Sequence, residues 1–182
     1  QTDQFLYVGL PGRKIWRRTG RSVMDISFER LRGGKDEWLT PPYIFEALGK
    51  FDLDPCAPVI RPWDTATAHF DITMDGLNQK WDGRVWLNPP YGKETGKWLE
   101  RMAEHNCGTA LIFARTETNN FFKYIWPVAR GIMFLRQRLV FHNVDGTKPN
   151  NSAGAPSCLV AYGDMDADIL QNCGLPGKYL KI

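Results

Sequence analysis

Val85-Trp86-Leu87 is an apolar run that leads directly into the tetrapeptide Asn88-Pro89-Pro90-Tyr91. Large apolar residues followed by a turn signal predict a buried strand, which we place at residues 84–87. Two consecutive prolines fix the turn after the strand, because neither proline is free to rotate about φ. The stretch therefore predicts one strand of a packed sheet, with a rigid polar turn at its carboxyl end.

The turn carries groups that can hold an amino nitrogen. The side-chain carbonyl oxygen of Asn88 can accept one hydrogen bond and a prolyl carbonyl a second, while Tyr91 offers a flat face for stacking. A nitrogen conjugated to a heteroaromatic ring is a poor nucleophile, so a catalyst must hold both of its N–H groups and align it with the donor. The tetrapeptide thus indicates methyl transfer onto nitrogen. A purely structural Pro-Pro turn is the alternative, since many folds contain one.

Helical and strand patterns alternate from Lys35 onward. We expect helices at residues 40–49, 95–106, 119–129 and 166–173, strands at residues 51–54, 84–87, 109–114, 132–135, 138–141 and 157–162, and loops with one short strand at residues 56–80. Thr40 before Pro41 resembles an N-cap with proline at the first helical position. The alternation implies parallel strands with right-handed crossovers, and the closing strands imply an antiparallel edge. The prediction is an α/β fold with a mixed, mostly parallel sheet and helices on both faces.

The composition sets broad limits on the class of protein. A length of 182 residues with 43% apolar residues fits one globular domain of ordinary size. The uncharged apolar stretches are well short of the ~20 residues that cross a bilayer, and the N-terminus has no apolar segment of signal-peptide form. We therefore predict a cytoplasmic protein without a membrane partner. The 4 cysteines and 3 histidines are widely separated, which predicts neither a metal site nor a disulfide framework.

The first 34 residues are more basic than the rest of the chain. They hold seven Lys and Arg residues against three acidic residues, a balance of +4, which leaves −1 for residues 35–182 out of the total of +3. Five of the basic residues lie between Arg13 and Arg21, with Trp16 among them, a composition that suits phosphate contacts. A solvated flexible arm is the alternative. We divide the chain into a basic N-terminal arm at residues 1–34 and a catalytic domain at residues 35–182.

Several segments occur in an order that is typical of one family. They are DEWLTPP at residues 36–42, LDPCA at 53–57, DGL at 75–77 followed by Trp81, WLNPPYG at 86–92, ARTET at 114–118, FLRQRLVF at 134–141 and APSCLV at 155–160. Together they resemble the phage-type DNA N6-adenine methyltransferase (Dam) family over roughly residues 36–163. This order is much more specific than the tetrapeptide alone.

The resemblance implies a Rossmann-like fold that uses S-adenosyl-L-methionine, with cofactor and substrate at the carboxyl ends of the parallel strands. It implies cofactor contacts by Thr40, Pro41, Asp54, Pro55, Cys56, Ala57 and Asp75, and a catalytic motif made of Asn88, Pro89, Pro90 and Tyr91. Many methyltransferases have a glycine-rich turn after the first strand, but residues 54–61 contain no glycine. Asp64 and Asp71 are both candidates for the carboxylate that binds the cofactor ribose.

The implied activity is site-specific transfer of a methyl group to the N6 amino group of adenine in DNA. The target adenine would be flipped out of the duplex, stacked on Tyr91 and held by Asn88 and a prolyl carbonyl, with direct in-line transfer. We expect DNA contacts from Arg115, Arg136 and Arg138 near strand ends and from Arg17 and Arg18 in the arm, with surface solvation or carboxylate pairing as the alternative. The family suggests a phage- or prophage-encoded protein that protects DNA against restriction.

Other functions remain open at this point. The same motif chemistry could act on cytosine N4 or on a glutamine side chain in a protein. A catalytically inactive DNA-binding relative is a further alternative, because the expected glycines after Asp54 are missing. The recognition sequence and the oligomeric state cannot be read from residue types.

Overall fold

A computed structural model describes residues 5–10, 13–18, 38–150 and 152–182 of the chain. The chain divides into two compact units, residues 1–35 and residues 36–182. The first unit contains β1 (Phe5–Leu10) and β2 (Arg13–Arg18), which pair in antiparallel register. Arg17 and Arg18 therefore lie in a regular strand. The rest of the predicted arm, residues 1–4, 11–12 and 19–34, and the first two residues of the predicted DEWLTPP segment lie outside the described residues.

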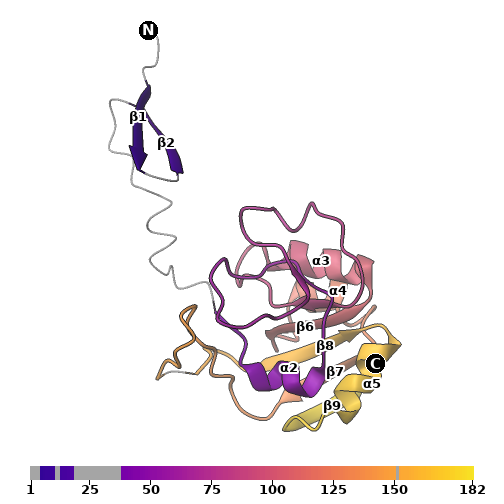
Figure 1. Cartoon of the computed structure of the whole chain (residues 1–182). Helices are drawn as coiled ribbons and strands as arrows, with labels where there is room; N and C mark the ends of the chain where they lie inside the picture. Colours follow the sequence, from indigo (N-terminus) through magenta and orange to yellow (C-terminus); the bar gives the residue numbers. More distant parts are fainter. Residues whose placement is uncertain (1–4, 11–12, 19–37, 151) are drawn as a thin grey trace. The chain divides into compact units, whose positions relative to one another are not determined.

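The second unit is built on a seven-stranded sheet in the order β4-β3-β5-β6-β8-β7-β9 (Figure 1). Its strands are β3 (Leu53–Asp54), β4 (Ala68–His69), β5 (Val85–Leu87), β6 (Gly108–Phe113), β7 (Gly131–Leu135), β8 (Ser157–Tyr162) and β9 (Gly177–Lys181). Neighbouring strands pair in parallel from β4 to β6, and in antiparallel fashion from β6 through β8 and β7 to β9. The sheet is mixed, as predicted.

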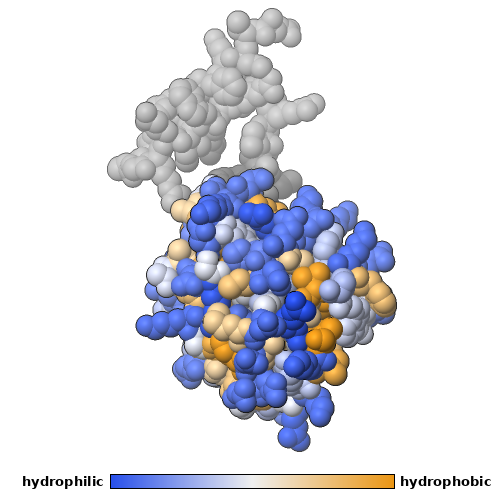
Figure 2. Space-filling view, turned by 90° about the vertical axis from the view of Figure 1, so that its right-hand side faces the viewer, coloured by the Kyte–Doolittle hydropathy of each residue, from blue (hydrophilic) through white to orange (hydrophobic). Residues whose placement is uncertain are grey.

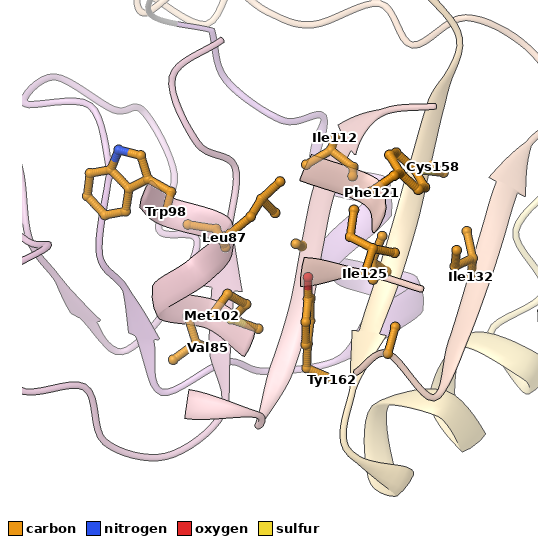
Figure 3. Close-up of a cluster of buried hydrophobic side chains, with 14 of the residues drawn as sticks. Val85, Leu87, Trp98, Met102, Ile112, Phe121, Ile125, Ile132, Cys158 and Tyr162 are labelled. Atoms are coloured by element: carbon orange, nitrogen blue, oxygen red, sulfur yellow. The ribbon is translucent and has the colours of Figure 1, made fainter. Parts of the chain in front are cut away.

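Helices cover both faces of the sheet. They are α2 (Pro42–Leu48), α3 (Thr95–His105), α4 (Asn119–Tyr124) and α5 (Asp164–Asn172). Side chains alternate across each strand, so Val85 and Leu87 pack with α3 and α4 on one face, while Trp86 packs with α2 and α5 on the other. Figure 3 shows the first of these two cores, between the sheet and helices α3 and α4. The domain thus has two apolar layers that hold the central strands in place.

The central strands of the sheet are buried on both faces. Every residue of β8 is buried, and in β6 all residues except the last are buried. Gly108 starts β6 with φ of 134°, and a Cβ atom at this position would lie 2.0 Å from the carbonyl oxygen of Val85. Only glycine allows this close approach of β6 to β5. The carboxyl ends of these strands are consequently fixed relative to one another.

Three sequence-based expectations about secondary structure were wrong. Residues 138–141 form no strand. Their burial alternates as in a strand, since Leu139 and Phe141 are buried and Val140 is exposed, but they do not pair with a neighbouring strand. The helix expected at 119–129 ends at Tyr124 and continues as turns. Thr40 is not the N-cap, because Pro41 occupies that position and the preceding Leu39 pairs with His142. In addition, β9 lies in a segment that we expected to be a tail.

The outer surface of the second unit is largely hydrophilic on the face shown in Figure 2, with apolar side chains in small separate groups. Such scattered apolar residues are normal for a surface in water. The helices of the described residues are short, and none of them is long and apolar enough to cross a membrane. A functional site is therefore expected at the ends of the sheet strands and not at an apolar surface patch.

The order of the strands reverses between β3 and β5. The chain passes from β3 to β4 on one side of β3, and then crosses to β5 on the other side before it continues to β6. In open α/β sheets, ligands bind in the crevice at the carboxyl ends of the strands where such a reversal occurs. Asp54 and Leu87 are the last residues of β3 and β5. The turns that follow them are therefore the first place to look for a site.

Candidate active site

The turns after β3 and β5 are tied together by a cysteine. The thiol of Cys56 donates a hydrogen bond to the backbone carbonyl of Asn88, with Sγ and O 3.2 Å apart. The backbone N–H of Cys56 also donates to Oδ1 of Asp54, at 3.1 Å. The predicted cofactor turn and the predicted catalytic motif thus form one connected structure, although 32 residues separate Cys56 from Asn88.

The amide of Asn88 is held in one orientation. Its Nδ2 donates to the backbone carbonyl of Trp38, at 3.3 Å, and its Oδ1 accepts from the hydroxyl of Tyr91, at 3.4 Å. A carbonyl oxygen has two lone pairs, so Oδ1 can accept a second hydrogen bond. The side chain is half-buried and can therefore still be reached by a ligand. The arrangement thus leaves Oδ1 with a lone pair that can accept a hydrogen bond from a substrate amino group.

Tyr91 lies in an aromatic group at the rim of the site. Its ring stacks on Phe113, with ring centres 4.1 Å apart and planes at 16°, and meets Phe141 edge to face at 6.5 Å. Burial raises the pKa of the Tyr91 hydroxyl, which therefore stays neutral at pH 7 and acts as a donor. Since Phe113 covers one face of the ring, only the other face could stack against a base. Phe113 was not among the site residues expected from sequence.

The two prolines of the motif have different surroundings. Pro89 is buried and Pro90 is exposed. The carbonyl of Pro90 accepts a hydrogen bond from the hydroxyl of Thr95, at 2.8 Å, which links the turn to the start of α3. The Pro90 carbonyl is thus already used in a hydrogen bond within the protein. The Pro89 carbonyl is the better candidate for a second contact with a substrate amino group.

The Asp75-Gly76-Leu77 segment packs against the turn after β3. A Cβ atom on Gly76 would lie 1.9 Å from the carbonyl oxygen of Pro55, so this contact requires glycine. The carbonyl of Gly76 accepts from the indole N–H of Trp81, at 2.8 Å, which fixes the segment. Asp75 itself is exposed, with φ of 51°, and lines an open hollow that extends toward α3. The third predicted cofactor element therefore also lies beside the β3 turn.

Asp54 is the buried carboxylate of the site. Only 3% of its surface is exposed, and it accepts hydrogen bonds from the hydroxyl of Thr65 and from the backbone of Cys56. Burial dominates and raises the pKa of Asp54 from 3.8 to about 6, although these hydrogen bonds act in the opposite direction. Strongly shifted carboxyl groups are concentrated at functional sites. Thr65 is a site residue that sequence reasoning missed, because nothing in the polar loop around it distinguishes it.

Two further polar side chains near the site are buried without partners. Thr40 is 2% exposed, and its hydroxyl makes no hydrogen bond within the described part of the chain; the same holds for Nδ1 of His142. Trp63 lies between the two segments, since its indole N–H donates to the carbonyl of Thr40 and its ring meets His142 edge-on at 5.3 Å. A buried polar group without a partner costs free energy, so each one needs an explanation. A ligand that is absent from the structure is one such explanation.

Most of the sequence matches a family model. The model is described as DNA N-6-adenine-methyltransferase (Dam), and it covers residues 29–171. The chain belongs to the Dam family. Membership implies a methyltransferase that acts on adenine in DNA. Searches of curated proteins and of solved structures found no match.

Three of the arginines that we expected to contact DNA lie near the carboxyl ends of the sheet strands. Arg115 follows β6, and Arg136 and Arg138 follow β7; all three are exposed. Because β5, β6 and β7 run in the same direction, their carboxyl ends lie on the same side of the sheet as Asn88. None of the three arginines forms an ion pair with a described residue. They remain candidates for phosphate contacts.

The described residues contain no cluster of metal-ligating side chains. Among residues 5–10, 13–18, 38–150 and 152–182, no group of three or more His, Cys, Asp or Glu side chains could hold a metal ion. All four cysteines are free thiols. The Nε2 atom of His69 accepts hydrogen bonds from the backbone N–H groups of Thr65 and Ala66, both at 3.3 Å. A nitrogen that accepts these bonds must be unprotonated, and the pKa of His69 is lowered, chiefly by burial.

The raised pKa of Asp54 predicts a pH-dependent difference in stability between the wild type and Asp54→Asn. The folded state holds the proton more tightly than the unfolded state, so the carboxyl's contribution to stability is greatest below pH 3.8 and is lost as pH rises through about 6. The loss amounts to about 3 kcal/mol at one pKa unit per 1.36 kcal/mol. Urea unfolding at several pH values should therefore show that the stability of the variant rises relative to that of the wild type between pH 4 and pH 7.

The comparison with the variant is essential, because His69 acts in the opposite direction over part of this range. Its lowered pKa means that stability is lost as pH falls through the unfolded value of 6.5. His69 is present in both proteins, so its effect cancels in the difference. A stability difference that stays constant with pH would show that the Asp54 carboxyl is not perturbed by burial.

Proposed function

We propose that this chain transfers the methyl group of S-adenosylmethionine to the N6 amino group of an adenine that is flipped out of DNA. The observation that carries the proposal is the fixed amide of Asn88. The bond from its Nδ2 to Trp38 leaves Oδ1 as the acceptor, at the reversal point of the sheet. An exocyclic amino group is the donor that such an acceptor fits.

The topology supports a Rossmann-like methyltransferase fold. Four adjacent parallel strands, a reversal between β3 and β5, and helices on both faces are the features expected of an open α/β sheet that binds a nucleotide-like ligand. The antiparallel part, from β8 to β9, lies at the other side of the sheet. It extends the sheet without covering the carboxyl ends of β3 and β5.

The residues around the β3 turn fit S-adenosylmethionine as cofactor. Thr40 offers a buried hydroxyl without a partner among the described residues, and Asp54 is a buried carboxylate that a cationic ligand would stabilise. When bound, the cofactor supplies a methyl group that is already activated on a positively charged sulfur. We assign its binding to Thr40 and Pro41, to the turn formed by Asp54, Pro55, Cys56 and Ala57, and to Asp75.

The target base would be held by three groups of the motif. Oδ1 of Asn88 and the carbonyl of Pro89 would accept hydrogen bonds from the two N–H groups of the amino group, and the face of Tyr91 away from Phe113 would stack on the base. Flipping a base costs a few kcal/mol, and aromatic stacking of ~1 to 3 kcal/mol offsets much of this cost. The Phe113 ring behind Tyr91 fixes the platform before the base arrives. Preorganisation of this kind reduces the entropy lost on binding.

Alignment is the main catalytic contribution of the protein. Well-oriented reacting groups can gain about 7 to 11 kcal/mol relative to free reactants, and acceptor dipoles facing the positive charge that develops on N6 add to this. The methylated nitrogen is then a strong acid and loses its extra proton readily. A dedicated histidine or cysteine base is therefore not required, and the neutral hydroxyl of Tyr91 is not asked to act as one.

The thiol of Cys56 is expected to position Asn88. Cys56→Ala removes the hydrogen bond to the Asn88 carbonyl and should lower kcat about threefold to tenfold, as expected for a bond worth ~1 kcal/mol. Cys56→Ser keeps a donor and should recover most of the loss. Steady-state kinetics on DNA would measure both variants, with cofactor titrations run in parallel. Equal rates for the alanine and serine variants would mean that the bond has no positioning role.

The exposed arginines predict a salt-dependent contribution to DNA binding. Arg138→Ala should weaken binding about equally for all DNA sequences and lower the slope of log K against log salt by about one unit, because one phosphate contact is lost. Arg130→Ala is the matched control, since Arg130 is exposed but precedes β7 at the opposite edge of the sheet. Fluorescence anisotropy at several salt concentrations would measure both slopes. An unchanged slope for Arg138→Ala would remove it from the interface.

An inactive DNA-binding relative and a methyltransferase for another nitrogen are the competing functions. One experiment separates them: labelled S-adenosylmethionine is first titrated onto the protein by equilibrium dialysis and then incubated with DNA or with protein acceptors, and the nucleosides of the labelled DNA are separated. We expect saturable cofactor binding and label in DNA alone, in its adenine nucleosides and not in its cytosine nucleosides. DNA binding without cofactor binding would favour the inactive relative, and label in protein would favour a glutamine acceptor.

A further inference from the structure

The long connection between β7 and β8, residues 136–156, starts at the edge of the sheet that carries the catalytic motif. β7 runs in the same direction as β5, so the residue after Leu135 emerges on the same side as Asn88. Figure 1 shows this connection in orange, leaving the domain beside the segment that enters α2. Its first part, residues 136–150, is described throughout. This part is therefore placed to meet whatever enters the site.

Two contacts make this segment a wall of the site. The ring of Phe141 meets Tyr91 edge to face, with ring centres 6.5 Å apart. The next residue, His142, exchanges two backbone hydrogen bonds of 2.9 Å with Leu39, which adjoins Trp38, the residue that holds Asn88. The segment is thus joined to both partners of the Asn88 amide. A base stacked on Tyr91 would have its neighbours in the DNA close to this wall.

The turn that follows the wall is stiff. Asn143 and Thr147 are joined by a backbone bond of 2.9 Å and by a side-chain bond of 2.9 Å, and the Asp145 carboxylate accepts from the backbone and hydroxyl of Thr147. Gly146 lies against Pro62, since a Cβ atom there would be 3.0 Å from the proline ring. Reading a base edge requires a rigid support, because loosely held side chains lose entropy and selectivity on binding.

The side chains beyond this turn have the chemistry of base readers. Lys148 and Asn150 are exposed, and neither makes a hydrogen bond or ion pair with any residue that the structure describes. Lysine pairs with guanine O6 and N7, and asparagine with adenine N6 and N7, in the major groove. Arg136 and Arg138 at the foot of the segment, together with Lys148, outnumber the single acidic residue Asp145. The segment is therefore basic, as a DNA contact should be.

We propose that the segment at residues 143–150 reads the bases that flank the target adenine, with Lys148 and Asn150 as the reading side chains. This inference rests on the proposed function, since it requires DNA as the substrate. It adds the residues that select the sequence to those that select the amino group. It also assigns a role to a connection that lies after the catalytic motif. Residues 38–88 hold α2, β3, β4, β5 and their connecting loops, without a separate insert for target reading.

The test uses a pool of DNA duplexes that carry one adenine between randomised flanking bases. The full-length wild type, Lys148→Ala and Asn150→Ala each methylate the pool, and sequencing reports the rate for every context. Lys181→Ala is the matched control, because Lys181 is an exposed lysine that pairs with Gly131 at the opposite end of β7. Unfolding curves and cofactor affinity are measured for all four proteins.

We expect the wild type to favour some contexts and each loop variant to lose about tenfold or more of the discrimination at one flanking position, the effect of removing one good base contact. Lys181→Ala should keep the wild-type preference. Unchanged preferences in both loop variants, or a wild type without any preference, would overturn the reading role while leaving methyl transfer to DNA intact. A folded wild type that binds cofactor but methylates no duplex would instead overturn the proposed function, and the reading role with it.

Discussion

Asn88→Ala is expected to reduce methyl transfer to DNA at least a hundredfold while cofactor affinity stays at the wild-type level. The variant removes the acceptor that Nδ2, through its bond to Trp38, directs toward the substrate amino group. Loss of one preorganised hydrogen-bonding group at a reacting centre costs about 10²–10³ in rate. Single-turnover transfer rates and cofactor binding measured on the same samples would test both parts of the expectation.

The matched control for this variant is Asn172→Ala. Asn172 is exposed at the end of α5 and its Nδ2 donates to the carbonyl of Asp168, at 2.8 Å, so the same change of residue type away from the motif should leave transfer nearly unchanged. Wild-type turnover by Asn88→Ala would contradict the assignment of the motif. Loss of cofactor binding together with transfer would mean that Asn88 supports the cofactor turn and not the substrate.

Asp166→Ala is expected to destabilise the domain by about 3–5 kcal/mol, the cost of removing one partner from a buried ion pair. Asp166 is 1% exposed on α5, and its Oδ1 accepts from Nε and Nη2 of Arg84, at 3.0 and 2.9 Å, and from the hydroxyl of Thr109, at 2.6 Å. Arg84 also donates to the carbonyls of Leu48 and Lys50, both at 2.9 Å. The pair thus joins α2, β5, β6 and α5.

Urea unfolding would measure this loss, with Asp168→Ala as the control on the same helix. Asp168 is exposed, and its side chain should contribute little to stability. Arg84 precedes β5 and therefore lies at the edge of the sheet opposite to Asn88. Transfer activity per folded molecule should consequently be close to the wild-type value. A destabilisation below about 1 kcal/mol would show that the buried pair merely balances its own desolvation cost.

The central strands of the fold could be predicted from sequence because they are buried on both faces. β8 matches the expected residues 157–162, β5 begins one residue later than expected, and β6 begins and ends one residue earlier than expected. A mostly apolar run of this length, bounded by turn signals, has few other interpretations in a domain of this size. The mixed sheet followed from the missing helices between the last expected strands.

The errors arose where a tertiary partner decides the local structure. The sequence GKYLK at residues 177–181 is mostly exposed and has no apolar pattern, yet it forms β9 because β7 offers a free edge. Residues 138–141 have the alternation of a strand but lack a neighbour to pair with. Thr40 has the residue type of an N-cap, but Leu39 pairs with His142 and the N-cap is Pro41, one residue later than expected. None of these partners is visible in local residue types.

The candidate site shows the same division. The order of segments along the chain indicated which pieces belong together, and the structure brings the β3 turn, the Asp75 segment and the Asn88 motif to one end of the sheet. Their connections were not predictable, because Cys56 with Asn88 and Tyr91 with Phe113 are contacts between distant residues without a signature of their own. Trp63, Thr65 and His142 entered the site only through the structure.

Identification of the methylated nucleoside tests the central claim most directly. Unmethylated DNA would be incubated with the wild type and methyl-labelled S-adenosylmethionine, digested to nucleosides and separated. The proposed chemistry at Asn88 predicts label in N6-methyldeoxyadenosine alone. Label in N4-methyldeoxycytidine, or no label despite measured binding of both cofactor and DNA, would contradict it.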